Sequence, residues 1–153
     1  MRWNSYVIWP AGEFKVKLPS TFSISKRQVN QIIDQAKTGK PREVCGLMGG
    51  RRDKVEKLFP ATNVDTSDIT YMVDPKEQFS IMKEIRENEM ELVGIYHSHP
   101  DTEAYPSPTD CRLAFYEQVH YVIVSLKDAV PSIRAFKIIN NKVIESKLEV
   151  LND

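Results

Sequence analysis

Two histidines and an aspartate are the residues of this chain whose types and spacing best suit chemistry. His97 and His99 end an apolar run that starts at Leu92, and Asp110 follows after ten intervening residues, three of them proline. If the run is a β-strand, both imidazoles point the same way and can bind one metal ion. A turning loop of this length can bring the carboxylate back to them. Two imidazoles and one carboxylate leave a tetrahedral zinc with one open position for water, as catalytic zinc sites require.

Each of these features also has a purely structural interpretation. A His-x-His pair alone is a weak signal of metal binding. Ser107 and Asp110, with a proline between them, match a helix capping box. Glu43 alone would be a solvated acid at the end of a strand. His120 begins another apolar run and is more typical of a strand end than of a ligand.

The combination of these residues resembles the signature of the JAMM (MPN+) metalloproteases. In that family a serine lies three residues before the aspartate, as Ser107 precedes Asp110, and a glutamate lies upstream at the start of a Gly-containing strand, as Glu43 does. All five signature residues are present. The similarity in element order runs from about Phe22 to Leu151. The complete ligand set argues against the non-catalytic MPN scaffolds, which typically lack some of these ligands.

The resemblance implies a role for each of the five residues. His97, His99 and Asp110 would bind zinc. Glu43 would hold the attacking water and act as general base, and Ser107 would donate a hydrogen bond to the oxyanion. Such roles suit amide hydrolysis, because zinc lowers the pKa of bound water to about 7 and a positioned carboxylate can move the proton. The resemblance therefore implies a zinc-dependent peptidase or isopeptidase.

Three helices are predicted around this site. A capping box at Ser25 begins one helix, which Gly39 ends, and Asp74 begins a second. The third is expected over residues 108–118. Apolar residues at helical spacing are expected along one face of the second helix, namely Phe79, Met82 and Ile85. In the third helix Cys111, Ala114 and Phe115 are expected to face inward.

Apolar runs predict the strands. Residues 13–18 alternate and indicate an edge strand, which can pair within the domain or with a partner chain, so a homodimer is left open. The other predicted strands cover residues 43–48, 55–60, 71–73, 92–97, 121–125, 133–139 and 143–150, with hairpin turns at 49–54 and 140–141.

Helices interleaved with strands predict an α/β sandwich with a mixed central sheet flanked by helices. The resemblance implies the MPN architecture, which is similar to the cytidine-deaminase-like fold. We expect residues 1–20 to form an N-terminal extension that includes the edge strand, and residues 21–153 to form the catalytic domain.

Composition narrows the classes of function. The 153 residues fit one domain, and 21 basic residues balance 21 acidic ones, which gives no general attraction to nucleic acid or acidic membranes. No apolar run is long enough for a membrane span, and Pro10 interrupts any signal-peptide core, so we expect a cytoplasmic protein. Cys45 and Cys111 are too few for a disulfide framework. They are either redox-sensitive thiols or small buried side chains.

The substrate is indicated only by the resemblance. Many JAMM enzymes cleave amide bonds that follow the tail of a ubiquitin-like protein, and such a tail can add to an exposed strand edge. Residues 62–70 are either the lip of that groove or an ordinary surface loop. The compact chain is most similar to prokaryotic members that process sulfur-carrier proteins, so the expected partner ends in Gly-Gly. Two alternatives stay open, a non-catalytic MPN scaffold and a small-molecule zinc hydrolase.

Overall fold

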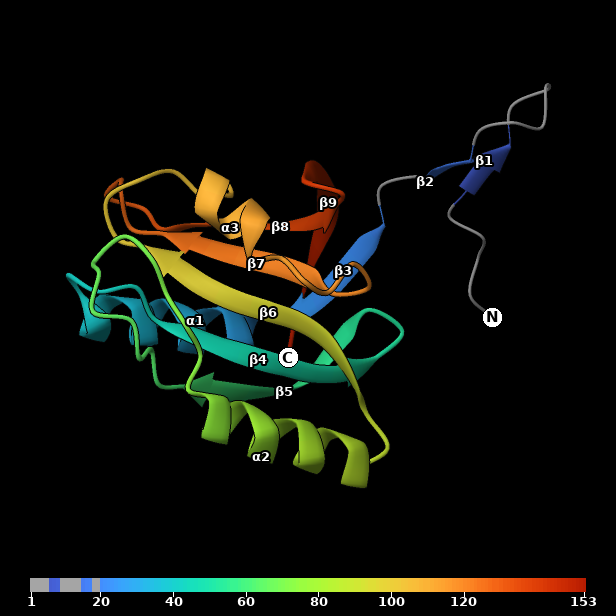
Figure 1. Cartoon of the computed structure of the whole chain (residues 1–153), viewed down its shortest axis with the longest axis horizontal. Coiled ribbons are helices and arrows are strands. Elements are labelled where there is room, and N and C mark those ends of the chain that lie inside the picture. Colours follow the sequence, from blue (N-terminus) through green and yellow to red (C-terminus); the bar gives the residue numbers. More distant parts are fainter. Residues whose placement is uncertain (1–5, 9–14, 18–19) are drawn as a thin grey trace.

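A closed, mixed β-sheet forms the body of the protein in the computed structural model, which describes residues 6–8, 15–17 and 20–153. Its strands are β3 (Thr21–Ser25), β4 (Cys45–Arg51), β5 (Lys54–Ala61), β6 (Glu91–His99), β7 (His120–Ser125), β8 (Ser132–Ile139) and β9 (Lys142–Leu151). They are hydrogen-bonded in the order β3-β5-β4-β6-β7-β8-β9, with β3–β5, β6–β7 and β3–β9 parallel (Figure 1). The prediction of a mixed sheet is confirmed, but the sheet closes into a barrel, which the expected sandwich did not include.

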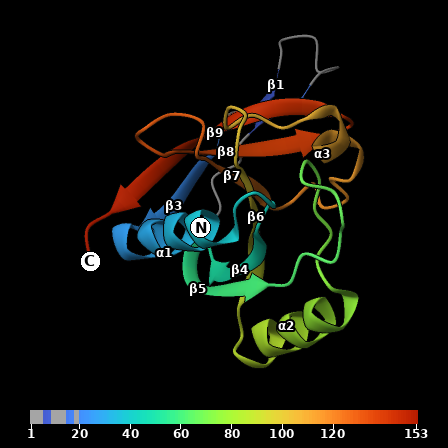
Figure 2. The same ribbon diagram turned by 90° about the vertical axis from the view of Figure 1, so that its left-hand side faces the viewer.

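Two long helices pack on opposite faces of the sheet, α1 (Lys26–Gly39) and α2 (Pro75–Glu87) (Figure 2). Successive residues of β4 contact different helices, because the side chains of a strand alternate between the two faces of the sheet. Met48 packs in the apolar core with Ile32 of α1, whereas Leu47 packs with Ile81 and Ile85 of α2. The predicted capping box at Ser25 is present, with the Ser25 side chain accepting a hydrogen bond from the Gln28 amide.

The third helix is much shorter than predicted. α3 covers only Pro108–Arg112, and Phe115, which was expected to face inward, is 76% exposed. In a continuing helix the amide of Tyr116 would donate to a carbonyl one turn earlier. It donates instead to the hydroxyl of Tyr121, at 3.1 Å, so the helix is replaced by a loop that leads into β7.

The strand predicted at residues 71–73 is wrong. A single bridge between Asn63 and Val73 is formed there. The side-chain oxygen of Asn63 accepts the hydrogen bond from the Met72 amide that a paired strand would otherwise accept. Phe79 does not share the buried face of α2 with Ile85, since its side chain is 72% exposed while Ile81 and Ile85 pack against the sheet.

One barrel strand was not predicted at all. β3 alternates polar and apolar residues, and Phe22 and Ile24 are fully buried. β3 closes the barrel by pairing with β9 along its length and with β5 at one position, Ser23 opposite Lys54.

The N-terminal edge strand is confirmed in part. β2 (Lys15–Lys17) pairs antiparallel with β1 (Tyr6–Ile8) in a separate two-stranded sheet, whereas residues 13, 14 and 18 of the predicted strand lie outside the described residues. Pairing with a partner chain, a homodimer and the domain division after residue 20 stay predictions. Within the described part of the chain, no helix is both long and apolar enough to cross a membrane.

Candidate metal centre

The two histidines lie at the end of β6, which continues to His99, two residues beyond its predicted end. In the sheet register, His97 is opposite Cys45 of β4 and Ile123 of β7. The expectation that both imidazoles share one face is met, because their Nε2 atoms lie 3.1 Å apart. Both side chains are buried, at 1% and 4% exposure. Pairing with strands on both sides at His97, and with β7 at His99, therefore holds both ligand candidates on a fixed backbone.

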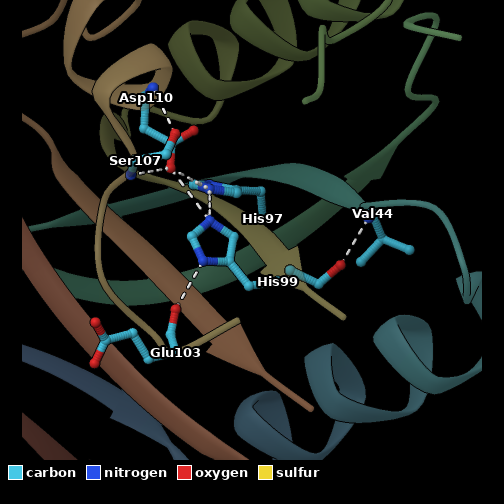
Figure 3. A network of polar contacts seen from close by, with 7 residues as sticks. Val44, His97, His99, Glu103, Ser107 and Asp110 are labelled. Atoms are coloured by element: carbon cyan, nitrogen blue, oxygen red, sulfur yellow. Dashed lines mark hydrogen bonds and ion pairs between the residues drawn. The ribbon is translucent and has the colours of Figure 1, made fainter. Parts of the chain in front are cut away.

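Asp110 completes a triangle with the two imidazoles. Its Oδ2 lies 3.1 Å from Nε2 of His97 and 3.2 Å from Nε2 of His99 (Figure 3). A tetrahedral zinc with bonds of about 2.0–2.1 Å would separate its ligand atoms by roughly 3.3–3.4 Å. The size of the triangle thus fits three ligands of one small divalent cation.

Asp110 is oriented by the helix cap that it helps to form. Ser107 is the N-cap of α3; its hydroxyl accepts a hydrogen bond from the Asp110 amide at 3.0 Å, and its own amide donates to Oδ2 of Asp110 at 2.9 Å. The capping interpretation and the ligand interpretation therefore describe the same carboxylate. Because the Ser107 hydroxyl acts here as an acceptor, its proton remains available for donation.

The carboxylate of Glu43 faces the same point. A Glu43 oxygen and a ring nitrogen of each of His97 and His99 lie within 4.8 Å of one another. Glu43 precedes β4 instead of starting it, and it is held by the next residue: Val44 donates to the Ser98 hydroxyl at 2.8 Å, and the Ser98 amide donates to the Val44 carbonyl at 3.0 Å. Glu43 and Asp110 could each complete a set of three ligands with the histidines, and the shorter distances favour Asp110.

Burial controls the charge of Glu43. The side chain is 5% exposed, and its Oε1 has no hydrogen-bond partner among the described residues. Burial raises the pKa of Glu43 from 4.5 to about 7, although the nearby His99 acts in the opposite direction. A carboxylate with a pKa near neutrality can both accept and release a proton, which a general base must do.

The imidazoles have different surroundings. The Nδ1 of His99 lies 2.8 Å from the Glu103 carbonyl, which can only accept, so Nδ1 carries the proton and Nε2 offers a lone pair in the neutral ring (Figure 3). Burial lowers the pKa of His97. For His99, burial acts in the same direction, but hydrogen bonds to Asp110 and to the Glu103 carbonyl raise its pKa.

The same contacts fix the charge of the aspartate. Burial alone would raise the pKa of Asp110, but hydrogen bonds and charge from His97, together with those from His99 and the Ser107 amide, hold it well below its usual range. One carboxylate oxygen and two imidazole nitrogens therefore converge on one point. This donor set fits a divalent cation.

Sequence reasoning missed two side chains at the centre. Tyr71 stacks on His97, with ring centroids 4.4 Å apart and planes inclined by 21°, and Asn63 donates to the Glu43 carbonyl at 2.9 Å. Both belong to the segment between β5 and α2. No spacing rule signals either contact, because each joins residues 20 or more positions apart.

The remaining histidine and the cysteines are outside the triangle. His120 is fully buried at the start of β7, where its Nδ1 lies 2.8 Å from the Ser146 hydroxyl, as expected for a strand-end residue and not for a ligand. Cys45 and Cys111 are free thiols, and burial raises the pKa of Cys45 to about 12. A thiol with such a pKa stays protonated, which fits a small buried side chain better than a reactive one.

Comparisons with known proteins concern the family and the fold of the chain. Residues 25–139 match the family model described as prokaryotic homologs of the JAB domain. The chain is 36% identical over 126 residues to the CysO-cysteine peptidase of Mycobacterium tuberculosis, covering 80% of this chain and 86% of that protein. It is 42% identical over 84 residues to a probable TtuB-protein conjugate cleaving protease of Thermus thermophilus, covering 54% of this chain and 55% of that protein.

The fold is also similar to a solved structure of a Desulfitobacterium hafniense protein. The TM-score is 0.79 at 36% identity, and the match covers 86% of this chain and 94% of the other. The family match and the complete set of five signature residues identify the chain as a member of the prokaryotic JAB family, the JAMM group that its sequence predicts.

Proposed function

We propose that this protein is a zinc-dependent hydrolase that cleaves peptide or isopeptide bonds at the C-terminus of ubiquitin-like or sulfur-carrier proteins. The observation that carries the proposal is the triangle of His97, His99 and Asp110 with the buried carboxylate of Glu43 beside it. Similarity to a CysO-cysteine peptidase and to a protease of TtuB conjugates supports the substrate class. The proposed substrate is a small protein with an exposed Gly-Gly tail.

The roles of the residues follow from their surroundings. His97, His99 and Asp110 would hold the zinc, which when bound supplies Lewis-acid activation of water and of the scissile carbonyl. Glu43 takes the proton from the attacking water and then delivers it to the leaving amine, because its carboxylate is buried beside both histidines and a positioned carboxylate can both accept and release a proton. The Ser107 hydroxyl donates a hydrogen bond to the oxyanion while its oxygen continues to accept one from the Asp110 amide.

Product analysis tests the proposal directly. The purified protein is loaded with Zn²⁺ and incubated with ubiquitin-like and sulfur-carrier proteins that are extended beyond Gly-Gly, and the products are weighed by mass spectrometry. We expect release of the extension directly after Gly-Gly, and loss of this release on treatment with EDTA or in the Glu43→Gln variant. Cleavage that persists in Glu43→Gln, or intact substrates with the zinc-loaded protein, would overturn the proposal.

A further inference from the structure

The two imidazoles of the centre are oriented by different means. His99 donates from Nδ1 to the Glu103 carbonyl, which fixes both its tautomer and the direction of its ring. The Nδ1 of His97 is buried and has no hydrogen-bond partner among the described residues. Histidines that bind metals usually donate from their second nitrogen to an oriented acceptor, and this contact sets the ring. Another contact must therefore hold the ring of His97.

Tyr71 supplies that contact. Its ring lies nearly parallel to the imidazole of His97, with centroids 4.4 Å apart and planes inclined by 21°. A parallel ring at this distance blocks rotation of the imidazole out of the plane that directs Nε2 to the metal position. Tyr71 also lines a mostly apolar cavity of about 300 Å³, together with Ile95, Asp110 and Phe115.

Asn63 fixes Tyr71 in turn. The side-chain oxygen of Asn63 accepts from the amides of Asp65 and Met72 at 2.9 and 3.0 Å, and its nitrogen donates to the Thr70 carbonyl at 3.4 Å. Bonds to residues 70 and 72 hold the backbone on both sides of Tyr71. The same nitrogen donates to the Glu43 carbonyl, so every donor and acceptor of this amide is used.

We infer that Tyr71 is a positioning residue that holds His97 by ring stacking where a hydrogen bond is absent, and that Asn63 sets Tyr71 relative to Glu43. The inference rests on the proposed function only in taking His97 as a metal ligand. It assigns to the segment between β5 and α2 a role in supporting the metal centre. One side chain of this segment holds a metal ligand, and another is bonded to the backbone of the base.

Cobalt binding tests the inference without any substrate. Metal-free protein is titrated with Co²⁺ against a competing chelator, and the visible absorption of the bound Co²⁺ is recorded. We expect Tyr71→Leu, which keeps apolar volume but loses the flat ring, to bind Co²⁺ roughly 10–100-fold more weakly, as is typical when the support of a ligand is removed. Its visible spectrum should also change, because that spectrum reports ligand geometry. Asn63→Ala should weaken binding in the same direction.

Two variants separate positioning from general damage. Tyr71→Phe keeps the ring and should restore the wild-type affinity and spectrum. Phe115→Ala removes an aromatic side chain from the same cavity, but one that is 76% exposed, and should leave both unchanged. Wild-type Co²⁺ affinity in a folded Tyr71→Leu protein, or an equal loss in Tyr71→Phe, would overturn the inference and leave the proposed function intact. Failure of the wild type itself to bind Co²⁺ would refute the metal site and both proposals with it.

Discussion

Replacing Glu43 by glutamine gives the sharpest test of the electrostatics of the centre, because the effect has a defined dependence on pH. The wild-type carboxyl has a pKa of about 7 in the folded protein and an ordinary value of 4.5. Between these values the folded state retains a proton that the unfolded state has lost. The free energy of unfolding of the metal-free protein therefore falls as pH rises through this window. Glutamine has a similar shape but cannot titrate, so this decline is absent from Glu43→Gln.

The size of the effect follows from the two pKa values. At about 1.4 kcal/mol for each pH unit, the full decline amounts to about 3.5 kcal/mol. Unfolding by urea, with EDTA present, gives the free energy of wild type and variant at about pH 5 and about pH 8. We expect the stability of Glu43→Gln relative to wild type to increase by about 2.5 kcal/mol between the two conditions. An equal difference at both pH values would refute the buried, titrating carboxylate.

Zinc provides the internal control for this experiment. A bound cation favours the ionised carboxylate nearby, so the advantage of Glu43→Gln at the higher pH should shrink or reverse when both proteins are loaded. The variant should still contain zinc, because the triangle of His97, His99 and Asp110 is unchanged. If Glu43→Gln lost the metal, Glu43 would be a ligand instead of the base.

Three further variants test the assignments of the remaining residues. His97→Ala/His99→Ala should abolish zinc binding, because two of three convergent ligands are lost; unchanged metal content by elemental analysis would contradict the site. Ser107→Ala should slow turnover roughly 10²–10³-fold, as loss of one oxyanion donor does. It also removes a helix cap, which contributes about 1 kcal/mol, so melting temperature and turnover should be compared. His120→Ala should cost about 3 kcal/mol of stability, because it empties a fully buried site that stacks on Phe22. Its zinc content should stay at the wild-type level, and a loss of zinc with the fold intact would contradict the assignment of His120 as structural.

The parts of the molecule that could be predicted from the sequence depend on short-range geometry. Alternation along a strand places His97 and His99 on one face, and the capping box fixes α1 from Ser25 onward. The turn at Asn140 and Asn141 also follows from local preference, since both residues adopt positive φ angles that asparagine tolerates. Each of these features is decided within a few residues of the chain.

The short third helix and the missing strand at residues 71–73 were not predicted because, in each, a side chain accepts a hydrogen bond that regular backbone pairing would otherwise use. The apolar spacing after Pro108 favours a long helix, but the Tyr121 hydroxyl takes the Tyr116 amide and a loop results. The segment before α2 has the composition of a strand, but the side-chain oxygen of Asn63, and not a partner strand, accepts the hydrogen bond from the Met72 amide. β3 is a different case, because the alternation that buries Phe22 and Ile24 is visible in the sequence and directly precedes the helix cap.

Asp110 shows why a capping motif and a metal signature should not be treated as competing interpretations. At the third position of α3, its carboxylate must turn back toward the helix start to accept the Ser107 amide, and this turn also directs Oδ2 to both imidazoles. The Ser107 hydroxyl meanwhile satisfies the Asp110 amide. The spacing of three residues that the cap requires is therefore also the spacing that directs this carboxylate to the two imidazoles. The local rule that forms the cap thus also orients a candidate metal ligand.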